Sequence, residues 1–246
     1  MTQADKPTFR FFFLFVLSTI VSAGLAQSAS ADPHLIAERS ENSLQAASPA
    51  LDRFENEIKS FEEHDQQSPP PAAPTVFVGS SSIRKWTDLE STFREFRALN
   101  RGFGGSTIPE VNHYVPRIVT KYAPVKVVLF AGSNDIAELH HNGKQISDDF
   151  QAFVALVHKA LPKCQIYYIS NSVAPSRLKW KKDYDDGNRL IAAYVKTKPY
   201  LHYIDVLPCM RDSSGSLRTD LFGPDRLHMT ADGYARWTPI IKSALK

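Results

Sequence analysis

Residues 75–84 are Thr-Val-Phe-Val-Gly-Ser-Ser-Ser-Ile-Arg, an apolar run that stops at a glycine and continues into three serines. The β-branched and aromatic residues at 75–78 favour a buried strand, and Gly79 permits a tight turn after it. A serine after such a turn lies at a helix N-terminus, where unpaired N–H groups stabilise negative charge that develops beside its hydroxyl. The stretch therefore predicts a strand, a turn and a helix that suit a nucleophilic serine. The alternative is that residues 80–82 only cap the helix, because serine is a preferred N-cap residue.

The alternation of strand and helix continues to the end of the chain. It predicts a parallel sheet covered by helices, in which ligands bind at the carboxyl ends of the strands. Strands are expected near 75–78, 97–100, 126–130, 165–170 and 201–206, and helices near 82–94, 107–122, 147–161, 180–197 and 230–245.

Four polar clusters lie at or beyond the ends of these predicted strands. They are residues 79–82 after the first strand, 100–106 after the second, 132–135 after the third and 225–228 beyond the fifth. The glycine-rich part of the second cluster would alternatively bind phosphate, but it lacks the Gly-x-Gly-x-x-Gly spacing and a P-loop lysine. Because the carboxyl ends of parallel strands meet at one edge of the sheet, we expect the four clusters to converge there.

In this order the four clusters resemble the sequence blocks of the SGNH hydrolases, also called GDSL-type esterases. The resemblance covers residues 75–237, and its Gly-Ser-Ser-Ser first block is similar to that of a subgroup of small bacterial members, with Ser80 in place of the usual aspartate. It implies a three-layer α/β/α sandwich with a five-stranded parallel sheet, which is flavodoxin-like. It also implies a catalytic set of Ser81, Asp225 and His228, and an oxyanion hole formed by Ser81, Gly105 and Asn134.

The chemistry of these residue types supports the same roles. Ser81 attacks an acyl carbon, His228 takes its proton and returns it to the leaving alcohol, and Asp225 holds the imidazole in the required tautomer. If residues 225–228 turn like a helix, the carboxylate and the ring face the same way. The backbone N–H groups of Ser81 and Gly105 and the amide of Asn134 are candidate donors to the tetrahedral intermediate.

The expected substrate is a small-molecule or glycan ester, and no metal or cofactor is required. The resemblance implies either acyl esters, as in lysophospholipases and thioesterases, or acetyl esters of carbohydrates. Arg177 and Trp180 follow the fourth strand and are expected at the rim of the cleft. A deep apolar cleft would favour acyl chains, whereas a shallow one with this rim would favour sugar acetyl esters. A domain of the same fold that binds glycan without hydrolysing it is the alternative outside catalysis.

Two pairs of side chains invite a metal or a disulfide. His140 and His141 are neighbours that point apart, and no third ligand has a matching spacing, so we expect loop histidines. Cys164 precedes the fourth strand and Cys209 follows the fifth. Parallel strands place these cysteines roughly 20 Å apart, beyond the ~7 Å Cα limit of a disulfide, so two free thiols are expected.

The N-terminus has the pattern of a signal peptide. Basic residues precede the apolar run 11–21, and small residues follow it, with cleavage expected after Ala26 or Ala31. The apolar run is too short for a permanent membrane span. We therefore expect residues 1–31 to be removed and the protein to be exported to the periplasm or secreted, without a stable membrane anchor.

Residues 32–74 form the segment between this peptide and the hydrolase-like domain, 75–246. Apolar residues recur on one helical face over 49–64, with Ser48 as the N-cap, and three prolines then form a stiff spacer. This helix either binds a partner or packs on the domain. A net charge of +3 over 246 residues gives no reason to expect nucleic-acid binding. The oligomeric state is not readable from the sequence.

Overall fold

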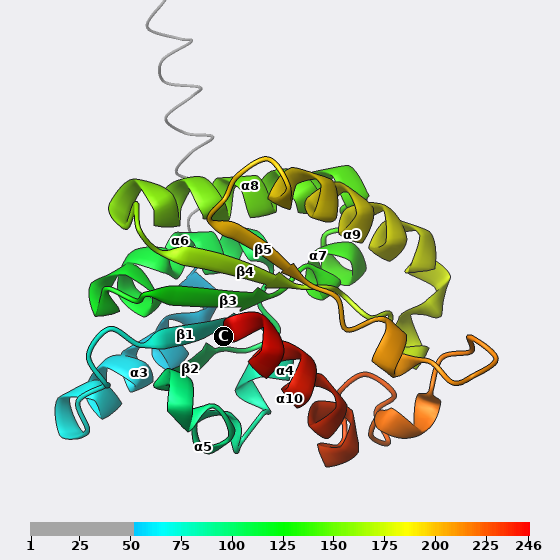
Figure 1. Cartoon of the computed structure of the whole chain (residues 1–246), viewed down its shortest axis with the longest axis horizontal. Helices are drawn as coiled ribbons and strands as arrows, with labels where there is room; N and C mark the ends of the chain where they lie inside the picture. Colours follow the sequence, from blue (N-terminus) through cyan, green and yellow to red (C-terminus); the bar gives the residue numbers. More distant parts are fainter. Residues whose placement is uncertain (1–51) are drawn as a thin grey trace, which may run out of the picture. The chain divides into compact units, whose positions relative to one another are not determined.

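The computed structural model describes residues 52–246. Its five strands form one parallel sheet in the order β2-β1-β3-β4-β5 (Figure 1). The predicted α/β fold with a five-stranded parallel sheet is confirmed. The strands are β1 (Thr75–Gly79), β2 (Ala98–Gly102), β3 (Lys126–Phe130), β4 (Gln165–Ile169) and β5 (Leu201–Ile204).

Helices cover both faces of the sheet. In Figure 1, α6, α8 and α9 lie on one face and α4, α5 and α10 on the other. The α-helices are α3 (Glu55–Gln67), α4 (Ser81–Arg84), α5 (Leu89–Thr92), α6 (Ile108–Ile118), α7 (Ser133–Glu138), α8 (Gly143–Ala160), α9 (Lys181–Val195) and α10 (Ala231–Leu245). Short 3-10 helices are η1 (Asp52–Phe54), η2 (Arg94–Phe96), η3 (Thr120–Tyr122), η4 (Pro175–Trp180), η5 (Pro208–Met210) and η6 (Thr219–Leu221).

The apolar run of β1 is explained by burial on both faces of the sheet. Val76 and Val78 belong to one core cluster, whereas Phe77, which points the other way, belongs to the second. A strand exposes successive side chains to opposite faces, so a strand covered on both sides needs apolar residues at every position. β1 is therefore an interior strand of a three-layer structure.

The strand registers bring three loops to the same edge of the sheet. Gly79 at the end of β1 pairs with Gly102 of β2 on one side and with Phe130 of β3 on the other. The three strands therefore end level, and the loops that follow them leave the sheet next to one another. This edge holds the first three of the four polar clusters that were predicted to converge.

Some helix boundaries differ from the predicted ones. The helix expected over 82–94 is divided into α4, α5 and η2, and α7 was not predicted, because a helix this short carries too little periodicity to detect. Helix α8 begins at Gly143 rather than at 147. Asn142 caps it by accepting from two backbone N–H groups, and Gln145 completes the capping box.

Helix α3 packs on the hydrolase-like domain, in agreement with the second of the two interpretations of its apolar face. Phe54 and Ile58 are buried in the same core cluster as the helices α6 and α8. The ring of Phe54 meets that of Phe103 edge-on, with centroids 5.2 Å apart. The predicted signal peptide and the predicted helix start at Ser48 lie outside the described residues.

The expectation of two free thiols is confirmed: Cys164 and Cys209 are both free, and Cys164 is buried. They lie at opposite ends of neighbouring strands, before β4 and after β5. None of the helices within 52–246 has the length and apolarity needed to cross a membrane.

Candidate active site

The turn after β1 places Ser81 at the first position of α4. Gly79 has φ of +141°, and a Cβ atom there would lie 2.0 Å from the carbonyl oxygen of Phe130, so only glycine fits. Ser80 is the N-cap, and its N–H donates to the same Phe130 oxygen at 3.2 Å. The turn is thus anchored to β3 and presents the Ser81 side chain at the edge of the sheet.

A chain of hydrogen bonds joins Ser81 to the last polar cluster. Ser81 Oγ lies 2.8 Å from His228 Nε2, and His228 Nδ1 lies 2.6 Å from Asp225 Oδ2. The other Asp225 oxygen accepts the N–H groups of Leu227 and His228, each at 3.0 Å. These bonds, above all the one from the His228 side chain, hold the pKa of Asp225 well below its usual range.

The segment that carries this pair does not turn like a helix. Arg226 has φ of +56°, and the chain reverses so that the Asp225 carboxylate receives the two following N–H groups. The carboxylate still reaches the ring nitrogen remote from Ser81. The Asp225 carboxylate and the His228 ring are therefore brought together by a turn, and not by the helical spacing predicted from the sequence.

Lys85 is a neighbour of this pair that sequence reasoning missed. Its Nζ lies 3.0 Å from His228 Nδ1 and 3.8 Å from Asp225 Oδ2. A ring nitrogen that donates its proton to Asp225 has no lone pair left for an ammonium group, so the favourable partner of Lys85 is the carboxylate. Its position four residues after Ser81, one turn along the chain, was the available signal.

Asn134 lies beside Gly105. Its buried amide Nδ2 donates to the carbonyl of Ser106 at 3.0 Å. A Cβ atom on Gly105 would lie 3.6 Å from the same Nδ2. Among the hydrogen bonds of residues 52–246, none uses the N–H of Ser81 or of Gly105. The two N–H groups and the second amide hydrogen of Asn134 are therefore available to an incoming oxyanion.

Arg177 fixes the orientation of the Asn134 amide. Its Nη2 donates to Asn134 Oδ1 at 2.8 Å, and its Nη1 donates to Ser133 Oγ at 2.6 Å. Ser133 Oγ in turn lies 2.5 Å from the Tyr184 hydroxyl of α9. Because guanidinium only donates, the amide oxygen must face Arg177 and the NH₂ group must face the Gly105 loop. The sequence predicts Arg177 at the rim of the cleft, but no sequence pattern indicates its contact with Asn134.

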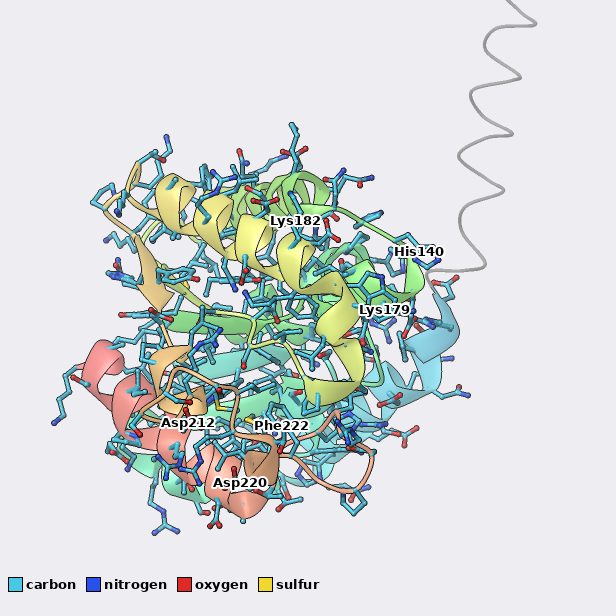
Figure 2. The ribbon with its side chains drawn as sticks, turned by 90° about the vertical axis from the view of Figure 1, so that its right-hand side faces the viewer. His140, Lys179, Lys182, Asp212, Asp220 and Phe222 are labelled. Atoms are coloured by element: carbon cyan, nitrogen blue, oxygen red, sulfur yellow. The ribbon has the colours of Figure 1, made fainter. Side chains whose placement is uncertain are left out.

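A small cavity of about 30 Å³ lies over Ser81. His228, Asn134 and Arg177 contribute polar groups to its lining. Its apolar walls are Phe130, Ala174, Met210, Phe222, Leu227, Met229 and Trp237, and Figure 2 marks the position of Phe222.

Trp180 is not among the residues that line this cavity, contrary to the expectation that it lies at the rim. Its ring packs instead against the core cluster beneath α8 and α9, and Lys179 Nζ lies 4.0 Å above the ring. Trp180 ends η4, whereas Arg177 is a full turn earlier and faces the site. The apolar surface of the indole thus contributes to packing rather than to the cleft.

Asp135 follows Asn134 in α7 and is fully buried. Its Oδ1 accepts the N–H of Ile108 at 2.8 Å and so joins α7 to the start of α6. Burial is the largest cause that raises the pKa of this carboxyl to about 7. Asp135 thus braces the loop between Gly105 and α6.

Comparisons with known proteins agree with this arrangement. The profile of the GDSL-like lipase/acylhydrolase family matches residues 75–236. The chain belongs to this family and is a hydrolase of the esterase and acylhydrolase type. No curated protein matches its sequence.

Several solved structures share the fold. A Streptococcus pneumonia protein provisionally named a platelet activating factor is 18% identical, with a TM-score of 0.69 over 84% of this chain and 99% of that one. A GDSL-like lipase from Bacteroides thetaiotaomicron is 22% identical, with a TM-score of 0.64 over 76% and 96%. A family 3 carbohydrate esterase from Clostridium thermocellum is 13% identical, with a TM-score of 0.56 over 71% and 95%.

Proposed function

We propose that the protein is an exported serine esterase that removes short acyl groups, foremost acetyl, from hydroxyl groups of carbohydrates. The observation that carries the proposal is the unbroken hydrogen-bond chain from Ser81 through His228 to Asp225, which opens into a small cavity beside Asn134. Nucleophile, base and orienting carboxylate are each within hydrogen-bond reach of the next, as acyl transfer requires.

In the first half of the reaction, Ser81 Oγ attacks the ester carbon while His228 Nε2 takes its proton. Asp225 accepts the Nδ1–H of the same ring, which keeps Nε2 free to act as the base and stabilises the imidazolium that forms. The C–O bond to the alcohol then breaks as His228 returns the proton to the leaving oxygen. An acyl group remains on Ser81.

In the second half, water attacks the acyl-serine and His228 again takes and returns one proton. Both halves pass through a tetrahedral oxyanion. The N–H groups of Ser81 and Gly105 and the amide of Asn134 are the donors placed to stabilise it, and each is worth roughly 3–4 kcal/mol in related oxyanion holes. Hydrolysis releases a carboxylic acid and restores Ser81.

The size of the cavity supports a short acyl group. A volume of about 30 Å³ corresponds to roughly two or three water-sized spheres, which accommodates an acetyl group, whereas most of a fatty acyl chain would have to extend out of it. Phe130 and Trp237 are packed against each other, with ring centroids 4.9 Å apart, and close the apolar end. The fold shared with the clostridial carbohydrate esterase is consistent with a sugar ester.

Export is part of the proposal and rests on the sequence of the first 31 residues, whose basic start, apolar run and small residues are typical of a signal peptide. A cell-fractionation experiment tests it. We expect the mature chain outside the cytoplasm, with its N-terminus at Gln27 or Asp32. An uncleaved chain in the cytoplasmic fraction would contradict export without affecting the proposed chemistry.

A panel of p-nitrophenyl esters from acetate to palmitate, together with acetate release from peracetylated xylo-oligosaccharides, tests the substrate. We expect kcat/KM to be highest for acetate and to fall steeply beyond butyrate, and Ser81→Ala to be inactive on every substrate. Higher kcat/KM on octanoate or palmitate would contradict the short-acyl assignment. Activity retained in Ser81→Ala would overturn the mechanism.

A further inference from the structure

Three side chains that the proposed reaction does not use form a cluster next to Asn134, the proposed oxyanion donor. They are Asp135 in α7, His141 in the loop after α7 and Asp149 on α8. Each offers one ligand atom, and all three atoms lie within 4.8 Å of one another. His141 Nδ1 and Asp149 Oδ2 are only 3.1 Å apart. The loop returns tightly, because the N–H of His141 donates to the backbone oxygen of Asp135.

Buried oxygen atoms around this cluster lack partners. Asp135 is 0% exposed; its Oδ1 accepts from Ile108, but its Oδ2 has no hydrogen-bond partner within the described part of the chain. The same holds for Oδ1 of Asn112, whose Nδ2 donates to the backbone oxygen of Asp149 at 3.1 Å. A buried, unpaired polar atom is costly and calls for an explanation such as a bound ion.

The charges also leave the cluster unbalanced. Asp135 and Asp149 together carry two formal negative charges when ionised. Within residues 52–246 the salt-bridge partner of Asp149 is His141, and neither carboxylate pairs with a lysine or an arginine. The nearby Lys144 is paired with Asp148 instead, at 2.5 Å. A neutral His141 and two carboxylates would be neutralised by one divalent cation.

We propose that Asp135, His141 and Asp149 bind a zinc ion. One imidazole nitrogen and two carboxylate oxygens form a ligand set that zinc accepts, whereas calcium and magnesium prefer oxygen ligands alone. The 3.1 Å between His141 and Asp149 is close to the ~3.3 Å edge expected of a tetrahedral zinc site with bonds near 2.0 Å. His141 and Asp149 are 22% and 25% exposed, so an ion has access from solvent.

The role of this zinc ion is structural support for the site. It ties the loop after α7 to α8 through His141 and Asp149, and its third ligand follows Asn134 directly in the chain. It takes no part in the ester chemistry. Both histidines lie in the loop between α7 and α8, as the sequence predicts; His140 is exposed at the surface (Figure 2), and the proposal gives a ligand role to His141 alone. His141 was not recognised because its partners come from neighbouring elements, six residues before it and eight after.

Isothermal titration of the EDTA-treated full chain with zinc chloride tests the proposal, supported by thermal melts with and without zinc. We expect one zinc ion per chain and a higher melting temperature in zinc. His141→Ala and Asp149→Asn should each weaken the affinity by at least about tenfold, since loss of a direct ligand exceeds the effect of its supporting contacts. His140→Ala, an exposed neighbour, is the matched control and should bind zinc as the wild type does.

Two results would overturn the proposal. One is the absence of both binding heat and a melting shift in the wild type. The other is zinc binding of equal affinity in the double variant His141→Ala, Asp149→Asn, which would assign the ion to other groups such as the free thiols. Ser81→Ala should bind zinc normally, so the outcome does not depend on the proposed esterase activity.

Discussion

Asn134 reaches the candidate site with its amide already oriented by two partners. Arg177 holds the oxygen at 2.8 Å, and the Ser106 carbonyl receives one of the amide hydrogens at 3.0 Å. A donor fixed in this way does not reorganise when the oxyanion forms, and such preorganisation is the main source of its stabilising effect. At the scale of single residues, the proposed mechanism therefore depends on the contacts of Asn134 as well as on its presence.

Asn134→Ala should lower kcat on p-nitrophenyl acetate by roughly 10²–10³ with little change in KM, because the donor acts mainly in the transition state. Asn134→Asp should be at least as inactive, since it places a carboxylate next to the developing negative charge. Steady-state kinetics and thermal melts of both variants provide the measurement. A folded Asn134→Asp variant with near-wild-type kcat would remove Asn134 from the mechanism.

Arg177→Met should also lower kcat, but by less, about tenfold, or ~1.4 kcal/mol of transition-state stabilisation. The methionine keeps much of the side-chain length yet frees the Asn134 amide to rotate. Arg177→Lys, which retains one donor, should recover part of the rate. The nearby, exposed Lys179→Met is the matched control and should leave kcat unchanged. A rise in KM at constant kcat would instead indicate that Arg177 binds substrate directly.

Asp225 makes a pH-dependent contribution to stability. Its folded pKa lies below the ordinary value of 3.8, mainly through the His228 hydrogen bond, so ionised Asp225 stabilises the native state above that pH. This contribution is lost as the pH falls from about 4 through the lowered folded value. The difference in melting temperature between the wild type and Asp225→Asn should be present at pH 7 and shrink below pH 4. The effect should be small, because the carboxylate is 47% exposed.

The order of the motifs along the chain identified the candidate site residues themselves. It gave no indication of the side chains that only contact those residues. Ser81, Asn134 and His228 follow strand ends in a recognisable order, and the parallel sheet brings these ends together. The contacts of Lys85 and Arg177 depend on rotamers and on the path of two loops, for which no spacing rule exists. Trp180 was misplaced for the same reason.

At the scale of elements, η1 and helix α3 support the loop that carries the candidate oxyanion donor Gly105. Glu57 Oε2 accepts the N–H of Gly104 at 2.9 Å, and Arg53 Nη2 lies 3.4 Å from the backbone oxygen of Gly105. Arg53 is itself held by Glu110 at the start of α6. The peptide groups that precede Gly104 and follow Gly105 are thus held by residues outside the four sequence blocks.

Glu57→Ala should therefore lower kcat by about tenfold, or ~1.4 kcal/mol, with a smaller change in KM, because the loop that carries the Gly105 N–H loses the contact at Gly104 that helps to position it. Glu57→Gln keeps an acceptor for Gly104 and should recover most of the rate. Glu63→Ala, on the exposed face of the same helix, is the control. Equal kinetics for Glu57→Ala and Glu63→Ala would show that α3 does not position the loop.

At the scale of the whole molecule, the described chain is one structure built on a sheet whose two faces are both covered. The sequence predicted this architecture well, because strands buried on both sides must be apolar throughout and the chain alternates strand with helix. It did not reveal how closely α3 is bound to β2. Asp65 of α3 contacts Arg101 of β2, whose side chain is only 4% exposed, and no sequence pattern connects residues so far apart.

This contact makes the stability of the sheet depend on α3. Tyr122 OH donates to the same Asp65 carboxylate at 2.5 Å, so Asp65 satisfies a buried charge and a partly buried hydroxyl together. Removing one partner of a buried ion pair typically costs about 3–5 kcal/mol, since the remaining charge stays away from water. The loss of buried Ile58 adds about 2–5 kcal/mol by comparison with other large core truncations.

A chain that begins at Pro74 should consequently unfold at much lower urea concentration than one spanning 46–246, the compact unit that retains α3. The combined loss is comparable to the whole stability of a typical domain, about 5–15 kcal/mol, so the shorter chain should be largely unfolded without denaturant. Circular dichroism during urea titration measures the difference. In the longer chain, Asp65→Asn should be clearly destabilised, and Arg101→Met should relieve part of that loss by removing the unpaired charge. Equal urea midpoints for the two chains would show that the sheet and its own helices suffice.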